Sequence, residues 1–113
     1  MNSTTQHVLK GSLPVIILTL LAGRERMYGY EITQQVKAMT AGEMVLTEGS
    51  LYPSLHKLEA EGLLTAETEV VAGRARKYYS LTKTGRLQTV SRVSELRSFI
   101  DNLNTILNLK PAR

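Results

Sequence analysis

The sequence predicts a mainly α-helical fold with one small β-hairpin, and three observations support this fold class. In three separate stretches apolar residues recur at spacings of three and four, as they do on one face of an α-helix. Between residues 64 and 81 this period gives way to two runs rich in β-branched and aromatic residues, with a glycine-containing turn between them. The chain has 113 residues, so one domain is expected.

The net charge of the chain, and the residue types and motifs that it lacks, limit the functions that the protein can have. The chain has 14 Lys and Arg against 10 Asp and Glu, a formal net charge of +4, which favours a polyanionic partner. Five basic residues and no acidic one lie between Arg74 and Arg86. There is no Cys, no cluster of His and carboxylates at metal-ligand spacing, and no glycine-rich phosphate loop. The sequence therefore predicts no metal, no cofactor and no enzyme.

The first element is an apolar run over residues 13–22, which is too short to span a bilayer. It has two interpretations. One is a signal-peptide core, because Lys10 precedes it, but no clear small-x-small cleavage site follows. We favour the other, a buried first helix with Ser12 as its cap, Pro14 in its first turn and an end near Gly23, preceded by an irregular segment. This interpretation implies a cytoplasmic protein that does not enter a membrane.

Two further helices follow. Residues 28–40 carry Ile32, Val36 and Met39 at helical spacing, and residues 44–46 could add a short strand. A third helix is expected from Ser50 to Glu61. Ser50 suits its N-cap, Pro53 falls in the expected first turn, and Gly62 suits its C-terminal end. Its apolar stripe consists of Leu51, Leu55 and Leu58.

The helices are followed by a predicted β-hairpin. Residues 64–71 and 76–81 read as strands, and residues 72–75 as the turn, in which Gly73 supplies conformational freedom. Tyr78 and Tyr79 alternate on the second strand, so one is expected in the core and the other exposed. Three helices and a hairpin form a winged helix-turn-helix, in which the third helix enters the DNA major groove and the wing lies by the backbone or minor groove.

A long C-terminal helix is expected from a cap at Thr82 to about Asn108, on the order of 40 Å. Its apolar stripe is too long for so small a domain to cover, which indicates a homodimer. The alternative is that it folds back on the first helix, and we expect both, with Val8 and Leu9 covering the junction. We therefore divide the chain into a winged-helix domain, residues 1–81, and a dimerisation helix with its tail, residues 82–113. The predicted dimer residues are Leu87, Val90, Val93, Leu96, Phe99, Ile100, Leu103 and Leu107.

Several short motifs, in order and spacing, resemble the PadR family of transcriptional regulators over roughly residues 9–86. The most specific are Tyr-Gly-Tyr-Glu at residues 28–31 and Gly-Ser-Leu-Tyr-Pro at residues 49–53. The other matching segments are residues 9–13, 17–18, 20–21, 61–63, 76–82 and 85–86, with Met27, Ile32, Glu48, Leu55, Leu58 and Glu59.

The resemblance implies a dimeric winged-helix repressor that binds an inverted repeat in double-stranded DNA, with a small-molecule effector in some members. The DNA-contact positions of the family map onto Ser50, Tyr52, Ser54 and Lys57 of the third helix and Arg74 and Arg76 of the wing. Two features depart from the family. Pro14 stands where a non-proline residue is common, and Phe99 is the only aromatic residue of the last helix. The second departure makes a sensor of flat drugs less expected.

Two function classes remain open on the sequence. The first is a sequence-specific transcriptional regulator, and the second is a winged-helix module that binds another protein through its long helix. They differ in whether the wing and the third helix together present one basic face.

Overall fold

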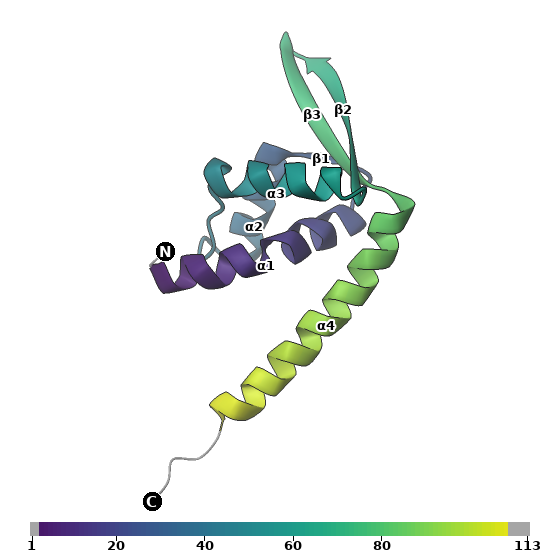
Figure 1. Cartoon of the computed structure of the whole chain (residues 1–113). Helices are drawn as coiled ribbons and strands as arrows, with labels where there is room; N and C mark the ends of the chain where they lie inside the picture. The colour runs from purple at the N-terminus through teal and green to yellow at the C-terminus, as the bar shows by residue number, and fades with distance from the viewer. Residues whose placement is uncertain (1–2, 109–113) are drawn as a thin grey trace, which may run out of the picture.

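In a computed structural model, which describes residues 3–108, the protein forms four α-helices and a three-stranded antiparallel sheet (Figure 1). The fold class is therefore as the sequence predicts. The elements are α1 (Ser3–Ala22), β1 (Met27–Tyr28), α2 (Gly29–Met39), α3 (Glu48–Ala60), β2 (Leu64–Val71), β3 (Arg74–Leu81) and α4 (Lys83–Leu107).

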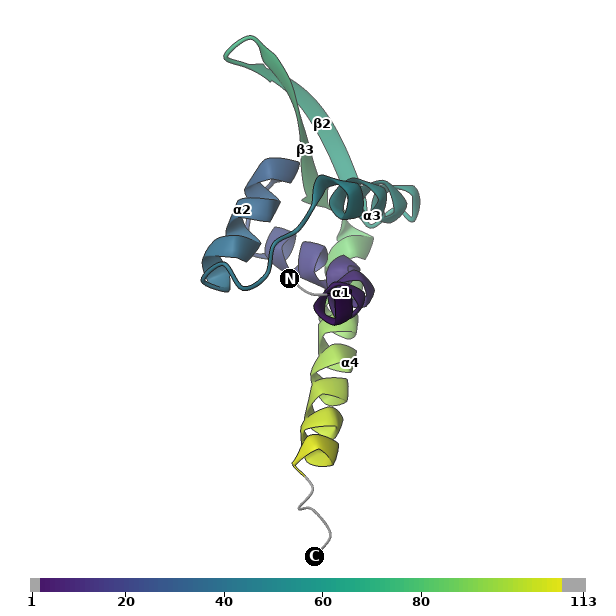
Figure 2. The ribbon, with the colours of Figure 1, turned by 90° about the vertical axis from the view of Figure 1, so that its left-hand side faces the viewer.

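The helices α1, α2 and α3 surround one core, and the hairpin of β2 and β3 projects from it as a wing. The strand order is β1-β3-β2, so β3 lies in the middle of the sheet. Figure 2 shows the wing rising above α2 and α3, while α4 leaves in the opposite direction. The two ends of the molecule therefore present different surfaces.

The first helix begins at Ser3, ten residues before Leu13, which would be its first residue if Ser12 were the cap. Leu9 and Leu13 are both buried in the core, and this burial accounts for helix on both sides of Pro14. The Ser12 hydroxyl donates a hydrogen bond to the carbonyl of Val8 instead of capping. Pro14 lies inside the helix, where it has no amide hydrogen for the ladder.

The apolar run at residues 13–22 is a core segment. Ile17, Leu18 and Leu21 are fully buried against the other elements. Among residues 3–108, no helix is long and apolar enough to cross a membrane.

The start of α3 also differs from the prediction. Its N-cap is Thr47, whose Oγ1 accepts a hydrogen bond from the backbone N–H of Ser50 at 3.2 Å. Ser50 thus lies within the first turn, and Pro53 lies beyond it. Two hydroxyl residues three apart both fit the cap pattern, and the extended backbone of Thr47 decides between them. The end is as predicted: Gly62 follows with a left-handed φ of +79°.

The short strand is β1 and not the predicted segment 44–46, which forms no strand. Met27 is fully buried and pairs with Tyr79 at the edge of β3. Leu46 instead fills the core from an irregular segment. In α2 the side chains of Ile32 and Val36 are buried as predicted.

Met39, the third residue of the predicted α2 stripe, is exposed. The helix ends there, so its last turn extends past the core.

The hairpin turn is tighter than predicted. Ala72 and Gly73 both adopt positive φ angles, +52° and +77°, which is the pattern of a two-residue hairpin turn. The strand β3 therefore begins at Arg74, two residues before the predicted start. Tyr79 is buried in the core, as predicted for one of the two tyrosines, whereas Tyr78 is half-buried and not exposed, since Arg26 lies over its ring.

Helix α4 begins and ends as predicted. The Thr82 side chain accepts from the N–H of Gly85 at 3.0 Å, and Asn108 is the C-cap. At Gly85 the helix meets the backbone of Leu63 so closely that any Cβ would clash. Gly85 and Thr89 are the only residues of α4 that are buried. At the predicted junction Leu9 is buried, whereas Val8 is exposed.

Candidate nucleic-acid interface

The wing and α3 lie at the same end of the molecule, and α4 projects from the other end (Figure 1). Leu51, Leu55 and Leu58 attach α3 to the core, so its opposite face is open to solvent. That outer face consists of Gly49, Pro53, His56 and Ala60, all exposed. It bears no Lys, Arg or carboxylate side chain.

The predicted contact residues of α3 divide between its two flanks. At 100° per residue, Tyr52 lies on the flank that bears Glu59, which bonds to the wing, whereas Ser50 and Ser54 lie on the other flank. Both serines are half-buried. Tyr52 is 37% exposed and its ring covers Gly29, where a Cβ would stand 2.7 Å from the tyrosine Oη. A side chain at residue 29 would displace Tyr52, so this glycine permits a close approach of α3 to the start of α2.

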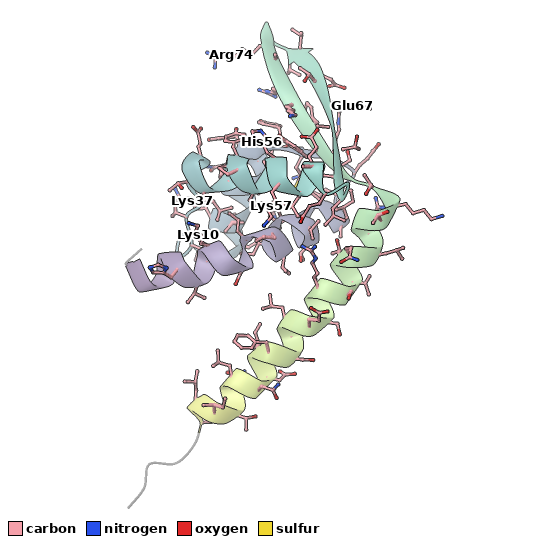
Figure 3. All side chains as sticks on the ribbon, in the orientation of Figure 1. Lys10, Lys37, His56, Lys57, Glu67 and Arg74 are labelled. Carbon is pink, nitrogen blue, oxygen red and sulfur yellow. The ribbon has the colours of Figure 1, made fainter. Side chains whose placement is uncertain are left out.

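Lys57 and His56 project from different sides of α3. Figure 3 shows His56 on the side toward the wing and Lys57 on the side toward α1. Both are exposed. The basic Lys57 therefore belongs to the serine flank, and His56, which the sequence did not single out for DNA, shares the side of the wing.

Three basic side chains of β3 have different surroundings. Arg74 is exposed near the wing tip (Figure 3). Arg76 is half-buried, with its guanidinium carbon 4.7 Å from the centre of the Tyr28 ring. Lys77 points to the other face of the sheet, where it donates to Glu59 of α3 at 3.3 Å. Among the described side chains, Arg74 and Arg76 form no ion pair.

The basic side chains at this end of the molecule lie on the wing and on the flank of α3 that carries Lys57. Two wing arginines of β3, Arg74 and Arg76, form no ion pair among the described side chains, whereas the outer face of α3 bears no Lys, Arg or carboxylate side chain. The wing and α3 thus form one surface with basic parts and a part without Lys or Arg, and not a uniformly basic face.

A further pair of charged side chains lies on the sheet, in the half of β2 nearer the hairpin turn. Arg26, in the turn before β1, donates two hydrogen bonds to Glu69 of β2, at 2.6 and 3.0 Å. These bonds lower the pKa of Glu69 and raise the pKa of Arg26. No local sequence pattern predicts this pair, because its members are 43 residues apart. The sheet brings them together, because β3 lies between the strand that follows Arg26 and the strand that carries Glu69.

The predicted dimer residues of α4 form an exposed stripe within this chain. Val93 and Leu96 are half-buried, and the other six are exposed: Leu87, Val90, Phe99, Ile100, Leu103 and Leu107. Three of these residues, Val93, Leu96 and Ile100, also line an apolar groove of about 430 Å³ between α4, α1 and α2. Its walls include Ile16, Leu20, Met44, Leu96 and Ile100.

The comparisons with known proteins agree on one family of transcriptional regulators. The model of the transcriptional regulator PadR-like family matches residues 17–90. An uncharacterized protein of Lysinibacillus sphaericus is 33% identical over 98 residues, which are 83% of this chain and 89% of that protein. Transcriptional regulator Rv3488 of Mycobacterium tuberculosis is 56% identical over 41 residues, 36% of this chain and 38% of the regulator. The crystal structure of a PadR family transcriptional regulator from Eggerthella lenta has a TM-score of 0.81 at 25% identity, covering 96% of this chain and 92% of that one.

Proposed function

Since the chain belongs to the PadR-like family of transcriptional regulators, we propose that it binds double-stranded DNA sequence-specifically as a homodimer and represses transcription from an inverted repeat. The observation that carries the proposal is the placement of α3 and two unpaired wing arginines on one end, with the exposed apolar stripe of α4 on the other. No catalytic step is part of this function, and its place of action is the cytoplasm.

In the proposed mechanism the wing contacts the DNA backbone and α3 contacts the bases. Arg74 and Arg76 contact phosphates, which supplies affinity without sequence preference. Helix α3 enters the major groove, whose width matches that of a helix. Both flanks of a helix in that groove face a DNA strand, so Tyr52 on one flank and Ser50, Ser54 and Lys57 on the other reach different strands.

The homodimer forms through α4. A pair of α4 helices would cover the stripe that this chain leaves open, and α3 and the wing would stay free because they lie at the other end (Figure 2). Two copies of α3 would then read two half-sites, as twofold symmetry requires.

Regulation by a small-molecule effector fits the same arrangement. The apolar groove between α1, α2 and α4 joins the DNA-binding body to the dimer helix. A ligand that changed the position of α4 would change the distance between the two copies of α3. Comparing DNA affinity and subunit angle with and without a bound ligand tests this; unchanged values for every compound that binds would refute it.

The deciding experiment measures binding to the DNA upstream of the protein's own gene, titrated across salt, with an unrelated fragment of equal length as control. We expect tight, salt-sensitive binding that prefers the upstream fragment. Equal and weak binding to both fragments would refute specific recognition and favour the alternative, a winged-helix module that binds another protein through α4.

A variant pair tests the wing. Arg74→Ala with Arg76→Ala should weaken binding to all sequences alike and flatten the salt dependence, by about 0.9 in the logarithmic slope for each lost phosphate contact. Lys10→Ala with Lys37→Ala removes the same charge from α1 and α2, away from the wing (Figure 3), and should leave the slope nearly unchanged. Lost discrimination with an unchanged slope in the wing variant would contradict the phosphate role.

A further inference from the structure

Glu69 faces one arginine on the sheet but is bonded to another. In the strand register Glu69 of β2 stands directly opposite Arg76 of β3. Opposite charges at such positions attract each other across a strand pair. The carboxylate nevertheless binds Arg26, which takes both of its oxygens, at 2.6 and 3.0 Å.

Arg26 reaches Glu69 by crossing the sheet. It precedes β1 at one edge, and its guanidinium carbon lies 4.1 Å from the ring centre of Tyr78 on the middle strand, β3. From there it bonds to Glu69 on the far strand, β2. Its path therefore covers the face of the sheet between Glu69 and Tyr78.

Arg76 is directed the other way. Its guanidinium lies over the ring of Tyr28 on β1, and the rings of Tyr28 and Tyr78 meet edge to face at 5.4 Å. The guanidinium groups of the two arginines thus lie over two different tyrosine rings that are in contact with each other. Arg76 is in none of the three ion pairs found among the described side chains.

We propose that Arg26 is a positioning residue for DNA binding, which holds Glu69 so that Arg76 keeps its charge for a phosphate. Without Arg26, the Glu69 carboxylate would still face Arg76, which stands directly opposite it on the adjacent strand. An ion pair there would neutralise the charge that a DNA phosphate needs and add a repelling carboxylate beside it. This inference rests on the proposed function, because it concerns how the wing meets DNA.

The test is a rescue experiment read through the salt dependence of DNA binding. Arg26→Ala should weaken binding several-fold and lower the logarithmic salt slope by about 0.9 per subunit, the value of one phosphate contact. Adding Glu69→Gln should restore the slope, because the competing carboxylate is gone. The double variant has the same net charge as the unaltered protein, so a change in total charge does not explain the rescue.

Glu67→Gln in the Arg26→Ala background is the matched control. Glu67 lies two residues away on the same face of β2 and is exposed, but it stands opposite Tyr78 and not Arg76. This double variant has the same net charge as the rescuing one, and we expect it to leave the salt slope low.

Two results would overturn the inference. If Arg26→Ala with Glu69→Gln binds as weakly as Arg26→Ala alone, Arg26 acts at DNA itself or only supports the wing. If both double variants restore binding equally, the effect is one of total charge. Absence of salt-sensitive, selective binding by the unaltered protein would overturn the proposed function as well, which separates the two failures.

Thermal melts establish that each variant folds. Should Arg26→Ala fail to fold, Arg26→Lys replaces it, since lysine keeps the charge but lacks the fork that holds both oxygens. A salt slope between those of the unaltered protein and Arg76→Ala is then expected, and a slope equal to that of the unaltered protein would overturn the inference.

Discussion

Two helices of this protein, α3 and α4, carry apolar residues at spacings of three and four, but these residues are buried in α3 and largely exposed in α4. In α3, Leu51 and Leu55 are 0% exposed, since α1, α2 and the sheet cover them. In α4, Val90 is 73% exposed and Phe99 61% exposed. The spacing of apolar residues thus indicates which face of a helix is apolar. Within a single chain, however, only the apolar face of α3 is covered, and that of α4 is not.

The difference follows from where each helix leaves the body. α3 is enclosed between elements that precede and follow it. In contrast, α4 is buried only near its start, at Gly85 and Thr89, then borders the groove with α1 and α2, and extends away beyond it (Figure 1). Apolar surface exposed to water over such a length is unfavourable. We therefore expect α3 to contribute to folding and α4 to association.

The largest expected effect is a charge placed in the α4 stripe. Leu96→Asp should abolish the dimer, because an ionised carboxylate would be buried in its seam. The mass in solution, measured by light scattering, should halve, while the helical content stays. Asn102→Asp adds the same charge at an exposed polar position and should leave the mass unchanged. An unchanged mass for Leu96→Asp would rule out this seam.

Removing the same atoms from each helix should separate folding from association. Leu55→Ala should lower the free energy of unfolding by about 2–5 kcal/mol at every protein concentration, because it leaves a cavity in the core. Leu103→Ala should act through the dimer, so its effect on the melting temperature should depend on protein concentration. Equal, concentration-independent losses in the two variants would mean that α4 is part of the folded core.

A smaller effect tests the start of α3. Thr47→Ala should cost about 1 kcal/mol, because it removes the side-chain acceptor of the Ser50 N–H. Ser50→Ala should cost less, since its hydroxyl only accepts a bond from Thr47 at an exposed site. Urea unfolding of both variants measures the difference, and a larger loss for Ser50→Ala would show that the cap is Ser50.

The smallest expected effect is on pH dependence. Arg26 lowers the pKa of Glu69 below its unfolded value, so the pair contributes stability above the unfolded pKa, near 4.3, and loses it as pH falls through the lowered value. Glu69→Gln should therefore reduce stability slightly at pH 7 and have no effect at low pH, about pH 2. A melting-temperature difference that persists undiminished at low pH would contradict this assignment.

Much of the fold could be predicted because local signals and burial agree. The stripe of α3, the burial of one of the two adjacent tyrosines, and the Thr82 cap each combine a local pattern with its expected environment. The start of α1 could not, because Ser12 and Pro14 form a local start signal that the burial of Leu9 and Leu13 overrides. The prediction of a short strand at residues 44–46 is wrong, because a strand of two or three residues is too short to show an alternating pattern in the sequence.

The candidate site likewise contains residues that a local sequence pattern predicts and residues that only the fold brings together. Arg74 and Arg76 are found from a basic run beside a turn, whereas Arg26 and Glu69 are brought together only by strand pairing. The contact roles predicted for Ser50, Tyr52, Ser54 and Lys57 stay predictions, now distributed over two flanks of one helix.

The sequence by itself determined the order and type of the main elements, the family, and which face of each helix is apolar, because these depend on neighbouring residues. Only the tertiary structure decided where α1 begins, which segment joins the sheet, and which carboxylate neutralises which arginine. Those outcomes depend on contacts between residues far apart in the chain. The bond between Arg26 and Glu69, 43 residues apart, exists because the sheet brings β2 and the start of β1 to one face.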